Sequence, residues 1–99
     1  MTAGSYQQAY KIANALVLGR LAACVSIIRN VESTFIWKGK IDRSKETLLV
    51  IKTKEACFKR LKNQVKKIHS YEVPEIIGIP IIAGSKEYLD WIAENSQNK

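Results

Sequence analysis

The amino-acid sequence predicts one α+β domain: an antiparallel sheet with helices on one of its faces and a short helix added at the C-terminal end. Three observations predict this class. Apolar residues recur at helical spacing in separate segments, and apolar runs typical of strands lie between and after them. In addition, 99 residues with 46% hydrophobic content are enough for a single core. No linker and no repeat divides the chain, so we expect residues 1–99 to form one domain.

The first helix is expected to begin after Ser5. Ser5 and Gln8, three residues apart, match a capping box, in which the side chain of the cap accepts a hydrogen bond from the start of the helix. The apolar residues that follow at helical spacing are Ala9, Ile12, Ala13, Leu16 and Val17. Gly19 and Arg20 are expected to end this helix.

Four apolar runs predict strands. They cover residues 21–28, 31–37, 47–53 and 76–82. In the second run, Phe35 and Trp37 share one face because side chains alternate along a strand. The sequence Lys-Gly-Lys at 38–40 supplies a turn, and a polar connection is expected from there to Ser44.

Two further helices are predicted. Residues 54–69 form a basic amphipathic segment, with Thr53 as the expected N-cap. Its inward apolar stripe comprises Phe58, Leu61, Val65 and Ile68, and its cations outside that stripe are Lys54, Lys59, Arg60, Lys62, Lys66 and Lys67. A short C-terminal helix is expected to be capped by Ser85 and to carry Tyr88, Leu89, Trp91 and Ile92.

The order of these elements is nearly that of a ferredoxin-like domain, β-α-β-β-α-β, with an added terminal helix. The first strand is missing or truncated, because only residues 1–4 precede the first helix cap. That strand lies in the middle of a ferredoxin-like sheet, and its absence would leave backbone groups unpaired. We therefore expect the native gene product to be longer, or another segment, such as one from a neighbouring subunit, to fill the gap.

Two strands predict association between subunits. The runs Leu-Leu-Val-Ile at 48–51 and 76–82 are apolar on both faces, which is typical of strands buried on both sides. Helices cover only one face of a ferredoxin-like sheet, so another subunit is expected to cover the second. Pro74 and Pro80 restrict the last strand to an edge or a bulge.

The net charge of +7 allows two interpretations of the basic helix. The basic helix is interpreted either as a solvated face or as a surface for nucleic acid or another polyanion. An RNA-binding module of the RRM kind shares the topology but needs aromatic residues on its central strands, which residues 47–53 lack. Nucleic acid is therefore the alternative and not the first expectation.

Other classes of protein are disfavoured. The chain has one histidine, no glycine-rich phosphate loop and no catalytic triad motif, so no enzymatic activity is expected. No apolar run approaches the length that spans a bilayer. Cys24 and Cys57 form no Cys-x-x-Cys motif and are expected to be free, buried thiols in a cytoplasmic protein.

The segment around the only histidine holds the candidate metal ligands. His69 and Glu75 are predicted to bind one metal ion if the chain bends at Pro74 or if they come from different subunits. The alternative is a structural role, with His69 contacting the last carbonyls of the basic helix. Trp37 lies at a predicted strand end, and Lys52 has Glu75 as one candidate acidic partner; both are candidates for a cleft between subunits.

The chain also resembles the CutA proteins, known as divalent-cation tolerance proteins. The stretches that carry the resemblance are RLAACVSII (20–28), FIWKGKI (35–41), LLVIKT (48–53), HSYEVPEIIGIPI (69–81) and EYLDWI (87–92). The resemblance implies a ferredoxin-like subunit in a tight homotrimer, similar to the PII signalling proteins, with Tyr71 joining Trp37 and Lys52 at an intersubunit cleft. It also implies a role in tolerance of copper and other divalent metals, with a metal ion or small anionic ligand as partner, no required cofactor and no established reaction.

Two departures from the family pattern concern the metal. Ser70 stands where the family usually has proline after the histidine, so the chain is less restricted there. In some members the first strand ends in a cysteine proposed as a copper ligand, and the corresponding position here is at best Met1, whose thioether is a weaker anchor.

Overall fold

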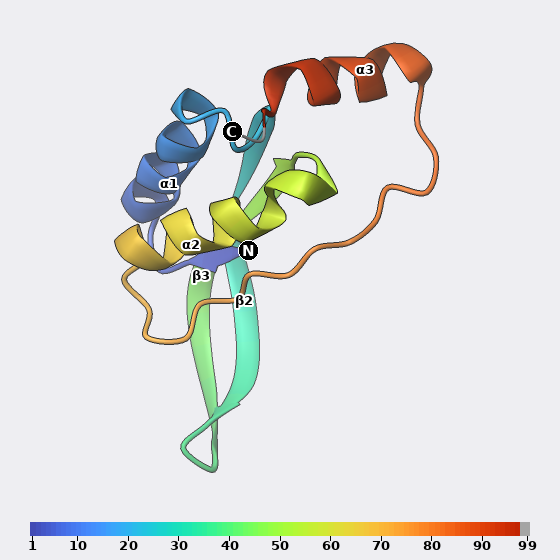
Figure 1. Ribbon diagram of the computed structural model, residues 1–99. Coiled ribbons are helices and arrows are strands. Elements are labelled where there is room, and N and C mark those ends of the chain that lie inside the picture. Colours follow the sequence, from blue (N-terminus) through green and yellow to red (C-terminus); the bar gives the residue numbers. More distant parts are fainter. Residues whose placement is uncertain (98–99) are drawn as a thin grey trace.

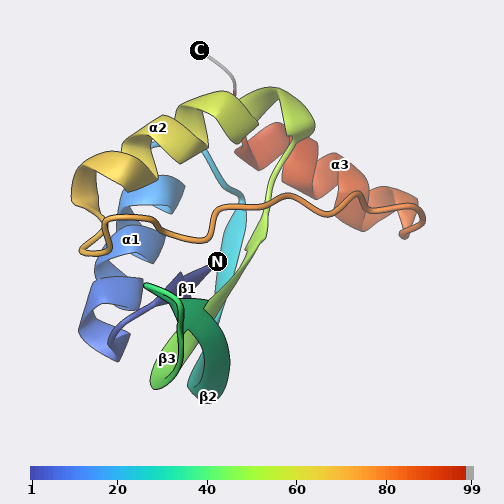
Figure 2. The ribbon, with the colours of Figure 1, turned by 90° about the horizontal axis from the view of Figure 1, so that it is seen from below.

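The protein folds around a three-stranded antiparallel sheet of order β1-β3-β2, seen in a computed structural model that describes residues 1–97 (Figure 1). The strands are β1 (Thr2–Ala3), β2 (Cys24–Trp37) and β3 (Lys40–Lys52). Helices α1 (Tyr6–Leu18) and α2 (Phe58–Ile68) lie side by side on one face of the sheet (Figures 1 and 2). The predicted α+β class, with an antiparallel sheet and helices on one face, is confirmed.

Strands β2 and β3 form a long hairpin that projects beyond the helices (Figure 1). Its turn consists of Lys38 and Gly39, with φ of 51° and 78°, and positive φ at both positions is the geometry that suits a two-residue hairpin. The predicted turn at 38–40 is therefore confirmed. The predicted polar connection to Ser44 is wrong, because β3 begins at Lys40 and its outer part is held by pairing with β2 and not by burial.

The predicted strands 21–28 and 31–37 are parts of one strand, β2, interrupted by a β-bulge. Ile28 pairs with Leu48 and Val31 with Glu46, so two residues of β2, Arg29 and Asn30, lie opposite one residue of β3. Asn30 has a φ of 61°. The bulge breaks the alternation of the apolar pattern, which is why the sequence reads as two strands.

Two of the three predicted helix caps are confirmed. The Ser5 and Ser85 hydroxyls accept hydrogen bonds from the backbone N–H groups of Gln8 and Tyr88, as predicted. Thr53 is not the cap of the basic helix, because the 3-10 turn η1 (Glu55–Cys57) precedes α2. The Thr53 hydroxyl instead donates a hydrogen bond of 2.6 Å to the carbonyl of Leu21.

The core lies between α1, α2 and the sheet. Its largest members, contributed by both helices and β3, are Ile12, Leu16, Leu49, Leu61 and Val65, each at most 3% exposed. Ile68 packs against this cluster, as the predicted inward stripe of α2 requires. Burying each of these side chains stabilises the fold by about 1.5–3 kcal/mol.

The first strand is present but consists of only two residues. Thr2 and Ala3 of β1 pair with Leu48 and Thr47 of β3, and Met1 extends the contact through backbone hydrogen bonds with Leu49. This short strand lies at the edge of the described sheet, beside β3.

The predicted strand at 76–82 is not formed. Residues 74–85 run as an extended arm without strand pairing, from the loop after α2 to α3 (Lys86–Asn95) (Figure 1). An extended segment becomes a strand only when a neighbour pairs with its backbone, and among the described residues the arm has none. The arm leaves Ile79 and Ile82 83% and 94% exposed.

The face of the sheet opposite the helices is apolar and open. Val50 and Ile28 are 42% and 48% exposed on it, whereas Leu49 on the helix face is buried. The run 48–51 therefore has apolar side chains on both faces of the sheet, and covering of the open face by another subunit stays a prediction. Within residues 1–97, no helix has the length and apolar character needed to cross a bilayer.

Candidate functional site

A groove of about 780 Å³ lies between the β2–β3 hairpin and the loop that follows α2. We call it the hairpin groove. Three of the five predicted site residues line it: Trp37 from the hairpin, and Tyr71 and Glu75 from the loop. Phe35, Arg43 and Glu46 of the hairpin line it as well. The groove thus joins aromatic surface with charges of both signs, a lining suited to a small polar ligand.

His69 lies at the C-cap of α2, as the structural interpretation of the sequence predicts. Its Nδ1 accepts a hydrogen bond of 3.0 Å from the backbone N–H of Tyr71, so Nε2 carries the ring proton. Nε2 then donates a hydrogen bond of 2.9 Å to the carbonyl of Thr2. Both nitrogens are therefore engaged, and the ring ties the end of α2 to β1.

Tyr71 and Glu46 connect the loop to β3. The Tyr71 hydroxyl donates a hydrogen bond of 2.6 Å to Oε2 of Glu46. Burial raises the pKa of Tyr71 to about 12, with further contributions from the hydrogen bond to Glu46 and from its charge. Burial opposes the charge of Glu46, but hydrogen bonds from Ser33, Tyr71 and Thr2 outweigh it and lower the pKa of this carboxyl. Glu46 is therefore an ionised acceptor at neutral pH.

The predicted metal ligands do not form a complete site within one chain. Glu75 Oε2 lies 3.3 Å from the N-terminal amine of Met1, while His69 makes the two hydrogen bonds described above. Among residues 1–97, no three His, Cys, Asp or Glu side chains are grouped so as to hold a metal ion. Ligation by His69 would require the ring to give up one of its hydrogen bonds, and further ligands would have to come from outside the chain.

Lys52 does not reach the hairpin groove within the chain. It pairs with Cys24 at one end of the hairpin, whereas Trp37 pairs with Lys40 at the other end. Its Nζ donates hydrogen bonds of 2.6 Å to Ser26 Oγ and 3.1 Å to the carbonyl of Val50. Lys52 can join Trp37 at one site only if the two come from different subunits.

Sequence reasoning missed Glu46 and Arg43 as groove residues. Arg43 lies in the predicted polar connection, and Glu46 lies between that connection and the predicted strand 47–53, whereas the structure places both in β3. The signal that was available is Glu46 itself, a carboxylate directly before an apolar strand, which is only 9% exposed in the structure. Cys57 is buried as expected, Cys24 is half-buried, and both thiols are free.

Comparison with known proteins identifies the family. Residues 1–95 match the sequence profile of the family described as CutA1 divalent ion tolerance protein. The divalent-cation tolerance protein CutA of Thermus thermophilus is 46% identical over 96 residues, covering 97% of this chain and 93% of that protein. The chloroplastic protein CutA of Arabidopsis thaliana is 42% identical over 88 residues, 89% of this chain, and the chain spans about half of that protein, 48% of its length.

Solved structures agree with the sequence matches. The divalent cation tolerance protein of Thermus thermophilus superimposes with a TM-score of 0.95 at 46% identity, covering 97% of this chain and 93% of that chain. The periplasmic divalent cation tolerance protein CutA of Archaeoglobus fulgidus has a TM-score of 0.93 at 43% identity, with the same coverage of 97% and 93%. The names of these relatives mention no enzymatic reaction. The chain belongs to the CutA1 divalent ion tolerance family.

Proposed function

We propose that the protein is a homotrimer that contributes to tolerance of divalent metal ions such as copper, without catalysing a reaction. It binds a metal ion or a small ligand at clefts between subunits, where Trp37 and Tyr71 of one chain meet Lys52 of another. His69 and Glu75 are the candidate metal ligands. A cytoplasmic location is part of the proposal, and the free thiols of Cys24 and Cys57 fit a reducing compartment.

The observation that carries the proposal is the apolar surface that one chain leaves open. The arm exposes Ile77, Ile79 and Ile82, and the sheet exposes Ile28 and Val50 on the face away from the helices. Large apolar side chains exposed in this way mark interfaces where they gather in patches. The arm also retains unpaired backbone groups, which a strand of a second subunit can pair.

The distribution of the predicted site residues also supports a site between subunits. Lys52 lies at the opposite end of the hairpin from Trp37, and the hairpin projects from the body of the chain (Figure 1). A projecting hairpin can lie against a neighbouring subunit. The end of one hairpin that carries Trp37 can then meet the end of the neighbour's hairpin that carries Lys52. His69 and Glu75 likewise lack further ligands within the described chain.

The subunit count tests the assembly. Light scattering after size exclusion is expected to give three times the 11.2 kDa mass of one chain. The variants Ile79→Glu and Val50→Glu place a charge on the open apolar surface and are expected to lower that mass. Leu18→Glu is the matched control, because Leu18 is 82% exposed on α1, away from both surfaces. A wild-type protein that stays monomeric would overturn the proposal.

Titration with copper and zinc tests the metal site. Calorimetry is expected to show saturable binding that His69→Ala and Glu75→Gln weaken at least tenfold, the usual order for losing a ligand or its support. Glu94→Gln, an exposed change on α3, serves as the control. Copper affinity unchanged in both site variants would remove His69 and Glu75 from the proposal, even if the protein is a trimer.

A polyanion-binding surface on α2 is the alternative, and one observation favours it. The five cations of α2 are Lys59, Arg60, Lys62, Lys66 and Lys67, and none of them forms an ion pair within residues 1–97. Binding to a single-stranded oligonucleotide that weakens steeply between about 50 and 200 mM salt would support this function. Equal binding by Lys59→Gln/Lys66→Gln and by wild type would exclude it.

A further inference from the structure

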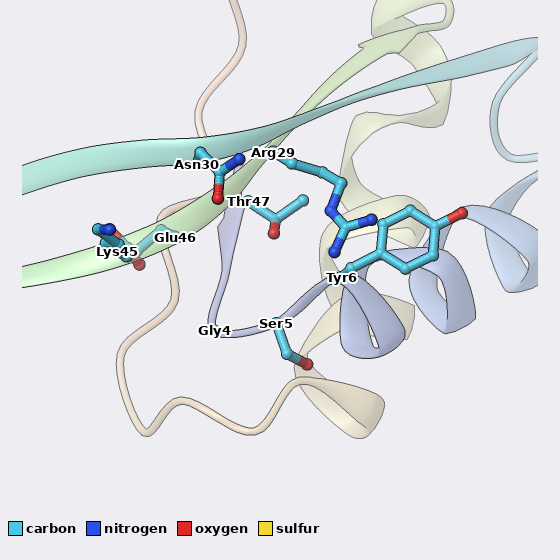
Figure 3. Close-up of a pocket in the computed structure, with 8 residues that line it drawn as sticks. All are labelled: Gly4, Ser5, Tyr6, Arg29, Asn30, Lys45, Glu46 and Thr47. Atoms are coloured by element: carbon cyan, nitrogen blue, oxygen red, sulfur yellow. The ribbon is translucent and has the colours of Figure 1, made fainter.

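A second, smaller cavity lies at the base of the hairpin, on the face of the sheet that carries the helices (Figure 3). Its volume is about 170 Å³, and we call it the bulge pocket. Since water occupies about 30 Å³ per molecule in the liquid, the pocket has room for a few waters or one small ion. Its chemistry comes from three elements: the β-bulge of β2, strand β3, and the N-terminus of α1.

The β-bulge places two polar side chains at this pocket. Arg29 and Asn30 are the two residues of β2 that oppose Thr47 of β3, and both line the pocket with Thr47. A bulge re-aims side chains that a regular strand would send to opposite faces. The positive φ of Asn30, 61°, shows that the backbone departs from strand geometry at this point.

The guanidinium of Arg29 is held in place by an aromatic ring. Its central carbon lies 4.6 Å from the centroid of the Tyr6 ring, as Figure 3 shows, and this stacking is a cation–π contact. Stacking uses the face of the guanidinium and leaves its N–H edges able to donate hydrogen bonds. Lys45 supplies a second cation at the pocket, and neither Arg29 nor Lys45 forms an ion pair with the residues that the structure describes.

Thr47 is a buried polar residue of the pocket. The residue is only 5% exposed, and its hydroxyl is directed into the pocket (Figure 3). No hydrogen bond of this hydroxyl is found within residues 1–97, and every buried side-chain N or O atom that the structure describes has a partner, so the hydroxyl is open to the pocket and not enclosed by protein. A hydroxyl that faces a pocket without a protein partner can donate to a ligand.

The start of α1 completes the site. This helix has 13 residues, and its first turn holds no acidic residue, so no carboxylate offsets its N-terminal partial positive charge, although the Ser5 hydroxyl accepts the N–H of Gln8. Glu46 also lines the pocket, but its carboxylate accepts the hydroxyl of Tyr71. Because side chains alternate along β3, the Glu46 side chain points to the opposite face from Lys45 and Thr47.

We propose that the bulge pocket binds a phosphate group, as inorganic phosphate or as the terminal group of a small phosphate monoester. Arg29 and Lys45 supply the charge, and Thr47 donates a hydrogen bond to one oxygen. The N-terminus of α1 faces the remaining oxygens, an arrangement that favours tetrahedral anions. All of these groups belong to one chain, and Arg29, Lys45 and Thr47 do not line the hairpin groove, so phosphate binding does not require the proposed metal cleft.

Calorimetric titration of the full chain with inorganic phosphate tests the proposal, at constant ionic strength with chloride as the balancing anion. We expect saturable binding of one phosphate per chain. Arg29→Gln and Thr47→Val are each expected to weaken binding at least about tenfold, as for loss of a hydrogen bond to a charged group. Thr47→Ser keeps the hydroxyl and is expected to bind within about threefold of wild type, which separates loss of the donor from loss of the fold.

Lys11→Gln on α1 is the matched control for net charge, because it removes one positive charge from an exposed position outside the pocket. Weakening by Lys11→Gln equal to that by Arg29→Gln would overturn the proposal, as would an absence of saturation in wild type. A parallel titration with glycerol 3-phosphate identifies the source: comparable affinity indicates a monoester, and binding of inorganic phosphate alone indicates the free ion. Light scattering and copper titration of the Arg29→Gln variant are expected to match wild type, so this site and the proposed function can fail independently.

Discussion

The hydroxyl of Tyr71 donates a hydrogen bond of 2.6 Å to Oε2 of Glu46, and this bond fastens the loop after α2 to strand β3. The same loop is tied to β1 through the ring of His69. The polar segment around the only histidine therefore acts first as a fastening between a helix and two strands. Its role as one wall of the hairpin groove depends on that fastening.

Tyr71→Phe is expected to make the stability of the protein fall less as the pH becomes alkaline. The pKa of Tyr71 is raised to about 12 in the folded protein, from 10.0. The folded state therefore holds this proton more tightly, and the stabilisation is present below pH 10 and is lost as pH rises from about 10 to about 12. Thermal unfolding from pH 8 to pH 12 is the measurement, and Tyr71→Phe is expected to show a smaller decline than wild type.

Tyr71→Phe is also expected to lower the free energy of unfolding at pH 7 by about 1.5–3 kcal/mol, the range for a hydrogen bond to a charged group. Tyr10→Phe is the matched control, because Tyr10 is exposed on α1. If Tyr10→Phe reduces the loss of stability at alkaline pH as much as Tyr71→Phe does, the Tyr71–Glu46 hydrogen bond is not the source of that loss.

Glu46→Gln is expected to act at acid pH. The pKa of Glu46 lies below its ordinary value of 4.5, so its carboxylate stabilises the folded state above that pH and ceases to do so as pH falls through the folded pKa. Urea unfolding should therefore find wild type more stable than Glu46→Gln at pH 7, with a gap that narrows below about pH 4.5. A gap that stays constant from pH 7 to pH 3 would contradict this. Glu32→Gln, exposed on β2, is the control.

Two leucines of α1 should differ sharply in their contribution to stability. Leu16 is fully buried, whereas Leu18, two positions later, is 82% exposed. Leu16→Ala is expected to cost about 2–5 kcal/mol in the free energy of unfolding, because a cavity adds to the lost burial. Leu18→Ala is expected to cost less than about 0.5 kcal/mol. Similar losses in chemical unfolding of the two variants would mean that Leu18 is buried in solution.

Gly4→Ala is expected to disturb the Tyr71 ring. A Cβ at this position would lie 3.2 Å from Cε1 and 3.3 Å from the hydroxyl oxygen of Tyr71. The ring must move to admit it, at a cost of about 1–3 kcal/mol in the free energy of unfolding. Gly78→Ala is the control, because its Cβ would meet Phe58 at an ordinary 3.6 Å. Unfolding in urea measures both, and equal stability of the two variants would show that the ring moves without cost.

Local features were predictable wherever a short stretch of chain determines them. Ser5 and Ser85 cap helices because each hydroxyl bonds a backbone group three residues away. The turn at Lys38 and Gly39 likewise depends on two residues. Thr53 was a reasonable cap by composition, but a contact with Leu21, distant in sequence, occupies its hydroxyl.

Features that depend on distant partners were not predictable. The run 76–82 has the composition of a strand, yet a strand needs a neighbour, and the described chain supplies none. Trp37, Tyr71 and Glu75 do meet at one groove, whereas Lys52 lies at the other end of the hairpin. The bulge pocket was missed entirely, because Arg29 and Thr47 come together only through the pairing of β2 with β3.

The β2–β3 hairpin also suggests an order of events during folding. Its pairs join residues close in sequence, beginning with Trp37 and Lys40 next to the turn, so little chain entropy opposes its closure. Strand β1 must instead bring Thr2 to Leu48 across all of α1 and β2. We therefore expect the hairpin to zip from its tip early and β1 to dock late. The docking of β1 would then position the start of α1 beside the bulge, making phosphate binding a late reporter of native structure.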